Sequence, residues 1–142
     1  MERSEDSDDR ALLDHVLVPV VHEADARATA ESLAPYNPNQ VTTLHVVEKG
    51  EGVPDKTPVV QSEEIAANAF AAVREVFPEA NDHTTYARDI VEAIFESAEE
   101  VDATSIVYRS RGGGRIMRFL AGDLSIKLVT QADRPVIALP RK

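Results

Sequence analysis

The residues most able to do chemistry lie in one segment, residues 109–123, which reads RSRGGGRIMRFLAGD. Four arginines and no acid fall between positions 109 and 118, in a chain whose formal net charge is -10. Consecutive glycines let a backbone approach a ligand closely, and arginine forks match the oxygens of a phosphate. The segment therefore predicts a cradle for a phosphate or another anion, with a flexible surface turn as the alternative interpretation.

The composition narrows the classes of function. The sequence has no cysteine, which excludes disulfides, thiolate metal sites and cysteine nucleophiles and suits a reducing cytoplasm. An excess of 25 acidic over 15 basic residues opposes attraction to nucleic acid or to an anionic membrane. No apolar run approaches the roughly 18 residues that a membrane span needs. We therefore expect a soluble cytoplasmic protein without nucleic-acid or membrane partners, and the acidic, lysine-poor composition leads to the hypothesis of a halophilic habitat.

The length of 142 residues fits one domain with one core. Residues 1–10, MERSEDSDDR, are acidic and polar, so we expect a disordered tail there. Residues 11–142 are expected to form the domain.

Short apolar runs rich in β-branched residues alternate with segments of helical periodicity. Ser62 is expected to cap the second helix, Pro78 to end it, and Asp89 to cap the third. The alternation predicts an α/β fold, a single doubly wound, five-stranded parallel sheet with helices on both faces. Ligands of such sheets bind beyond the carboxyl ends of the strands, which is where residues 109–123 fall. The expected strands begin at His15 and cover 40–48, 82–87, 103–108 and 135–140, and the expected helices cover 23–34, 62–77, a stretch after Asp89, and 124–132.

Five sequence pieces in a fixed order carry a family resemblance: HVLVPV, VTTLHVVE, VDATSIVYRSRGGG, AGDLSIKLV and ADRPVIALP. Together they span about residues 14–140, and the chain resembles the universal stress protein (UspA) family. The resemblance implies a Rossmann-like sheet of strand order 3-2-1-4-5, similar to the adenine nucleotide alpha hydrolases, and a homodimer formed through the last strand, Val136–Pro140. It also implies a binding or regulatory module of the stress response rather than an enzyme.

Many members of that family share a nucleotide signature, Gly-x2-Gly-x9-Gly-(Ser/Thr), which holds the phosphates of ATP. Carried onto this chain, Gly112 and Gly122 keep the second and third glycines with the correct spacing. The first glycine position is Arg109 and the hydroxyl position is Asp123. The family's acidic residue after the first strand falls on Val21. Pro19 and Val46 still match positions that line the nucleotide base.

These departures oppose the usual ATP mode. A carboxylate about 4 Å from a phosphate charge costs about 4 kcal/mol at an effective dielectric constant of 20, although Asp123 can still cap the following helix. Arg109 and Arg111 can return an attraction of similar size. Three alternatives stay open: ATP bound in the usual mode, with or without slow hydrolysis; a remodelled site for another nucleotide or anion; and an empty structural version of the site. The phosphate contacts of a filled site would come from Gly112, Gly113, Gly114 and Gly122.

Other polar residues have simpler interpretations. His22, Glu23 and Asp25 are expected to start a helix rather than to hold a metal. His45 is expected to be a core histidine with one hydrogen bond at most. No serine stands in a Gly-x-Ser-x-Gly elbow, and neither the acids of a receiver domain nor the cradle of a flavodoxin is present. We therefore expect no catalytic residue, no metal site and no obligatory cofactor, with ATP or another nucleotide as the open alternative.

Overall fold

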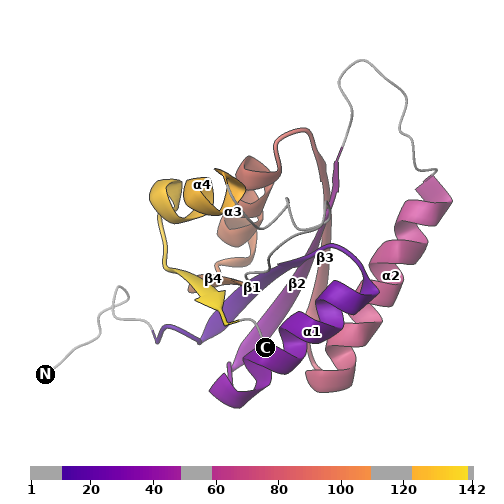
Figure 1. Ribbon diagram of the computed structural model, residues 1–142, viewed down its shortest axis with the longest axis horizontal. Coiled ribbons are helices and arrows are strands. Elements are labelled where there is room, and N and C mark those ends of the chain that lie inside the picture. The colour runs from indigo at the N-terminus through magenta and orange to yellow at the C-terminus, as the bar shows by residue number, and fades with distance from the viewer. Residues whose placement is uncertain (1–10, 49–58, 110–122, 141–142) are drawn as a thin grey trace, which may run out of the picture.

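The computed structural model describes residues 11–48, 59–109 and 123–140 (Figure 1). Five parallel strands form one sheet in the order β3-β2-β1-β4-β5, with helices on both faces. The predicted α/β class and strand order are confirmed, whereas residues 1–10, the expected tail, lie outside the described parts. The elements in chain order are β1 (His15–Val20), α1 (Glu23–Leu33), the short 3-10 helix η1 (Ala34–Tyr36), β2 (Gln40–Glu48), α2 (Val59–Val76), β3 (Asn81–Ala87), α3 (Ile90–Val101), β4 (Ser105–Arg109), α4 (Asp123–Gln131) and β5 (Val136–Leu139).

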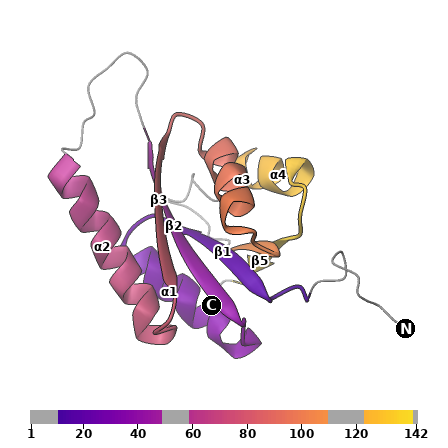
Figure 2. The ribbon, with the colours of Figure 1, turned by 180° about the vertical axis from the view of Figure 1, so that it is seen from behind.

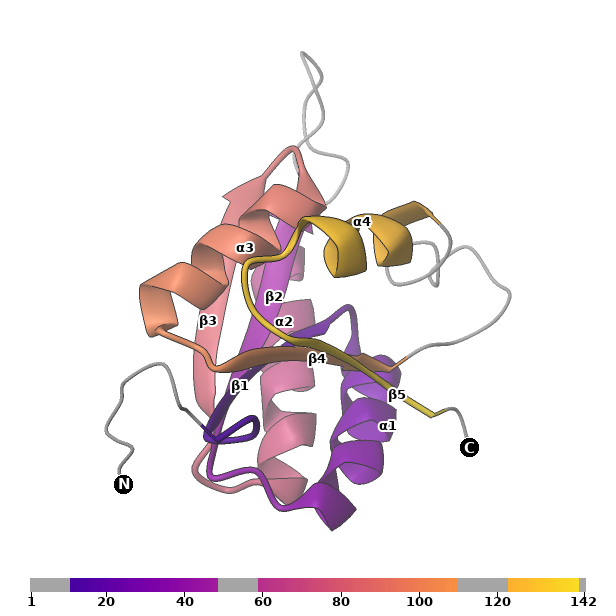
Figure 3. The same ribbon diagram turned by 90° about the vertical axis from the view of Figure 1, so that its left-hand side faces the viewer.

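The sheet divides the core into two apolar layers. Alternate residues of a strand point to opposite faces, so Val16, Val18 and Val20 of β1 lie on one face and Leu17 lies on the other. The valine face packs against α1 and α2, and the Leu17 face packs against α3 and α4. Figure 3 shows the two helix pairs on opposite sides of the strands. Because β1 is covered on both faces, its sequence is a continuous apolar run, as the sequence analysis expected.

The helix ends agree with the predictions except at α2. Asp89 caps α3, where its Oδ1 accepts a hydrogen bond from the Glu92 amide over 3.1 Å. The expectation that Ser62 caps the second helix is wrong, because α2 begins three residues earlier at Val59 and Ser62 is buried inside it. The glutamates that follow Ser62 therefore do not lie in the first turn.

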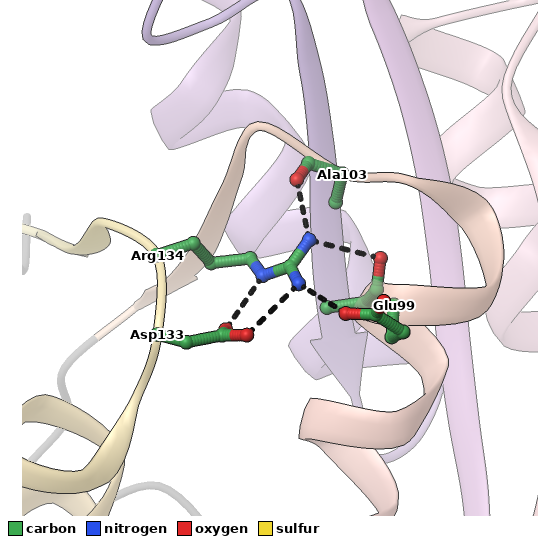
Figure 4. A network of polar contacts seen from close by, with 5 residues as sticks. Glu99, Ala103, Asp133 and Arg134 are labelled. Atoms are coloured by element: carbon green, nitrogen blue, oxygen red, sulfur yellow. Dashed lines mark hydrogen bonds and ion pairs between the residues drawn. The ribbon is translucent and has the colours of Figure 1, made fainter. Parts of the chain in front are cut away.

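Arg134 ties the start of β5 to the end of α3 (Figure 4). Its guanidinium donates to the carbonyl oxygens of Ala103 over 2.7 Å and Ala98 over 3.2 Å. It also forms ion pairs with Glu99 and Asp133 over 2.8 and 3.0 Å. A cation near the C-terminus of a helix complements the helix dipole, and here it also donates to the Ala103 carbonyl beyond the end of α3. The contact therefore fixes where the chain enters its last strand.

The two edges of the sheet are β3 and β5. Figure 2 shows β3 at the margin next to α2, with β5 on the far side of β1. Among the described residues, no helix is both long and apolar enough to cross a membrane.

Candidate functional site

The candidate site lies where the carboxyl ends of β1, β2 and β4 meet. β1 pairs with β2 on one side and with β4 on the other, so the strand order reverses at this point. Crevices at such reversals are where open α/β sheets bind ligands. Segment 109–123 leaves the sheet at the end of β4 and leads into α4.

Pro19 and Val46 come together on the α3/α4 face. Pro19 is buried and lies two residues after Leu17 on β1, so it shares the face of Leu17. Val46 is half-buried and packs against the same apolar layer. Val21 directly follows Val20, the register partner of His45, so Val21 lies at the level of Val46. Pro19 and Val46 therefore share one face of the sheet, and Val21 follows directly after the end of β1.

The turn between β1 and α1 is closed by its own side chains. The Val21 amide donates to Asp25 Oδ2 over 2.8 Å, and the Asp25 amide donates to His22 Nδ1 over 3.2 Å. His22 is thus the N-cap of α1, and Glu23 and Asp25 lie in its first turn, which confirms the interpretation as a helix start. Asp25 is almost completely buried. Two amides that could have served an incoming anion are therefore used by the protein itself, and a carboxylate stands beside them.

His45 supports the same turn from the neighbouring strand. Burial lowers its pKa, and a hydrogen bond to the backbone of Val21 partly counters that effect. The ring is 8% exposed. Within the described parts of the chain, its Nδ1 has no hydrogen-bond partner. His45 is therefore a neutral core histidine at neutral pH with a single described hydrogen bond, as the sequence analysis expected.

Arg109 lies on the other face of the sheet. It pairs in register with Leu139, which belongs to the apolar layer beneath α1 and α2, as does Val107 two residues before it. The structure therefore does not bring Arg109 onto the face that carries Pro19 and Val46. Its Nε is buried and has no hydrogen-bond partner in the described part of the chain. Its role as a counter-charge for a phosphate stays a prediction.

The remaining predicted phosphate residues cannot be placed. Asp123 is the first residue of α4, but its side chain lies outside the described parts, as does the whole of segment 110–122. The predicted cradle of glycines therefore stays a prediction. The members of that cradle outside the described residues are Arg111, Gly112, Gly113, Gly114 and Gly122.

Sequence reasoning found the helix start at His22 but missed the link from Asp25 to Val21. The spacing of His22 and Asp25 is that of a capping box, in which the cap accepts from the third helical amide and the third residue reaches back. That spacing was the available signal, although histidine is an unusual cap. Among the described residues, no group of His, Asp and Glu could hold a metal ion.

Comparisons with known proteins agree with this fold. The family model described as "Universal stress protein family" matches residues 13–140. The universal stress protein from Archaeoglobus fulgidus in complex with dAMP has a TM-score of 0.64 at 21% identity, covering 91% of this chain and 99% of that one. UspA from Lactobacillus plantarum has a TM-score of 0.62 at 23% identity, covering 92% and 99%.

A universal stress protein in complex with cAMP has a TM-score of 0.59 at 16% identity, covering 89% of this chain and 97% of that one. No curated protein sequence is similar enough to match the chain. At these identities the solved structures support the fold, while the family model covers nearly the whole chain. The strand order, the site at the reversal point and the family match lead to one conclusion: this chain belongs to the universal stress protein family.

Proposed function

We propose that this chain is a cytoplasmic binding or regulatory module of the universal stress protein type and not an enzyme. We also propose that it does not bind ATP in the family's usual mode. The observation that carries the proposal is the closed turn after β1. Where the resemblance requires a free acid, the chain has Val21, whose amide is held by the buried Asp25. A ligand would meet an apolar surface at Pro19 and Val46 and no ribose-directed carboxylate at position 21.

Electrostatics acts in the same direction. Asp25 places a negative charge at the N-terminus of α1, which would otherwise attract an anion. The sequence adds a second carboxylate, Asp123, at the start of α4. A triphosphate carries several negative charges and would be repelled by both. The proposal therefore predicts that affinity falls as the number of phosphates rises.

Calorimetry on protein freed of bound ligand tests this directly. We expect ATP to bind more weakly than AMP, and we expect the Arg109→Gly, Asp123→Ser double variant to gain affinity for ATP. The control is Lys127→Ala with Glu79→Ser, which changes the charges equally at exposed positions away from the turn. Tight ATP binding by the unchanged chain would refute the proposal. Equal affinity of the double variant and its control would show that position 123 does not govern the site.

A second candidate is a site for a nucleotide, ATP or AMP, or for another phosphate anion, built from segment 109–123. Two observations favour it: Arg109 Nε is buried without a described partner, and structural neighbours are in complex with dAMP and with cAMP. An anion beside Arg109 would supply the missing acceptor. Titration with AMP, cAMP and inorganic phosphate separates the two candidates, because only this one predicts saturable binding that Arg109→Gln weakens.

The module is further proposed to act as a homodimer joined through Val136–Pro140. β5 lies at an edge of the sheet, and an unpaired edge strand invites pairing with a copy of itself. Ile126 and Val129 of α4 are 60% and 59% exposed, so the helix that precedes β5 offers apolar side chains that a dimer could cover. Sedimentation of the wild type and of Ala138→Pro tests this, because proline removes an amide from the exposed edge. A wild type that stays monomeric at high concentration would refute the dimer.

A further inference from the structure

The other edge of the sheet, β3, is longer and less protected than β5. β3 has seven residues and β5 has four. Prolines flank β5 at positions 135 and 140, whereas β3 contains none. Within the described residues β3 pairs only with β2, so one side of its backbone carries free N–H and C=O groups. An edge of this kind is a template for another extended segment.

A small apolar groove runs beside this edge, between the carboxyl-terminal half of β3 and α2. Its volume is about 150 Å³, and a dry cavity of that size accepts a group as large as benzene. Phe70 and Ala66 are buried beneath it, and Tyr86 at its rim is 47% exposed. The lining residues are Val47, Ser62, Glu63, Ala66, Ala67, Phe70, Thr84 and Tyr86.

The edge and the groove are in register with each other. Thr84 and Tyr86 are two residues apart on β3 and both line the groove, so they share the face of the sheet that α2 covers. A strand added along β3 would place every second side chain on that same face. One of these side chains would therefore lie over the groove. Backbone pairing combined with a pocket for alternate side chains is the chemistry of β-augmentation.

The charge around the groove defines its partner further. Glu63 lies at the rim and is exposed, and no ion pair to it is found among the described residues. Asp82, near the start of β3, is paired with Arg74 and does not line the groove. Glu63 is therefore the charged residue of the lining that a partner can meet. The whole chain carries a formal charge of -10, which speeds the approach of a basic partner and slows that of a second copy.

We propose that the free edge of β3 binds an extended basic segment of another protein, with one apolar side chain in the groove and a cation beside Glu63. The partner adds a sixth strand to the sheet. This surface lies at the opposite edge from β5, so partner binding is compatible with the proposed dimer.

The test uses the full chain and the peptide acetyl-Thr-Lys-Thr-Leu-Thr-Lys-Thr-amide, which places leucine and both lysines on one face of a strand. Two-dimensional NMR should show saturable shifts at residues 81–87 and around the groove. Exchanging the leucine for serine, or methylating alternate peptide amides, should weaken binding about tenfold or more, which is about 1.4 kcal/mol. Absence of saturable binding, or shifts centred on another surface, would overturn the proposal.

Two pairs of variants make the test specific. Ala67→Trp fills the groove from an exposed position and should abolish binding, whereas Ala71→Trp, exposed on the same helix but outside the groove, should not. Glu63→Lys should weaken the lysine peptide and strengthen a peptide with glutamates in place of the lysines. Glu64→Lys, exposed but outside the lining, should leave both affinities unchanged.

Equal effects within either pair would contradict the assigned surface. Sedimentation without peptide tests whether the edge binds a second copy of this chain instead. If the wild type self-associates and Ala67→Trp abolishes that association, the edge binds a second copy and the proposed partner is wrong.

Discussion

Replacing Arg134 by methionine is expected to lower the free energy of unfolding by about 3 kcal/mol. The Ala103 carbonyl accepts from the guanidinium over 2.7 Å, and hydrogen bonds to charged groups contribute about 1.5 to 3 kcal/mol. The Ala98 carbonyl already accepts from the amides of Asp102 and Ala103, so losing Arg134 there adds little. The partners Glu99 and Asp133 are 75% and 69% exposed, so their ion pairs together add at most about 1 kcal/mol. Methionine keeps most of the apolar stem.

The measurement is urea and thermal unfolding of the wild type and the variant. For a chain of 142 residues, a loss of about 3 kcal/mol corresponds to a fall in Tm of about 10 °C. Arg134→Lys keeps the charge but not the fork, so it should lose about half as much. The matched control is Arg27→Met, because Arg27 pairs with two carboxylates, Glu23 and Glu75, and no contact with a carbonyl is found among the described residues. That variant should lose much less stability than Arg134→Met, because both ion pairs of Arg27 are exposed to solvent.

The pH dependence offers an independent check of the same contact. The hydrogen bond from Arg134 lowers the pKa of Asp133 in the folded state. A depressed folded pKa adds stability above the unfolded value of about 3.9, and that stability is lost as the pH falls below it. Arg134→Met should therefore flatten the acid side of the stability profile slightly, since Asp133 is largely exposed. If Arg134→Met costs no more than Arg27→Met, the carbonyl contacts do not hold β5 and the reasoning fails.

Three further outcomes are expected. Burial lowers the pKa of His45 in the folded protein, so the unfolded chain takes up the proton first and the free energy of unfolding should fall as the pH drops through about 6.5. Urea midpoints measured at about pH 7.5 and 5.5 should therefore differ less in His45→Gln than in the wild type. An equal difference in both proteins would contradict this prediction. Asn37 ends η1 with a left-handed φ of 54°. In chemical unfolding, Asn37→Ala should therefore lower the free energy of unfolding by about 1 kcal/mol, whereas Asn37→Gly should not lower it. Equal losses in the two variants would exclude backbone strain as the cause. The formal charge of -10 makes the acidic side chains repel one another, and salt screens this repulsion. The Tm should therefore rise between about 0.1 and 1 M salt. A Tm that falls with salt would contradict the halophilic hypothesis.

The features that local sequence could predict are those that depend on burial and turn chemistry. The bounds of β2, Gln40–Glu48, match the prediction because its β-branched and apolar residues stand between segments with the Gly, Pro and Asn of loops. Asp89 was found because its cap contact spans three residues. Contacts between residues far apart in the chain left no local signal. Arg134 reaches Ala103 across 31 positions, and no periodicity relates them.

The sequence could not predict which face of the sheet each candidate residue occupies. Sequence order put Arg109 next to the glycines and suggested one cluster with Pro19 and Val46. The register shows that Arg109 shares the face of Leu139 instead. Which face a strand's last residue occupies depends on the register of that strand with its neighbours, and a shift of one residue reverses every side chain. Spacing in one segment does not contain that information.

The closed turn after β1 and the aspartate at position 123 both make the proposed site less favourable for a phosphate. The turn uses amides that could donate to a phosphate, and the aspartate adds a negative charge. The amide of Val21 and the N-terminus of α1 are occupied by Asp25 and His22, so an anion at this reversal point would depend on segment 109–123 for its donors. In that segment the hydroxyl position of the family signature carries a carboxylate. Pro19 and Val46, in contrast, are apolar, as the proposed site requires of the positions beside a base. If the proposed site keeps its apolar contacts and has carboxylates where a phosphate would lie, the number of phosphates should affect affinity more than the base does. A series from nucleoside through monophosphate to triphosphate should then show affinity falling at each added charge.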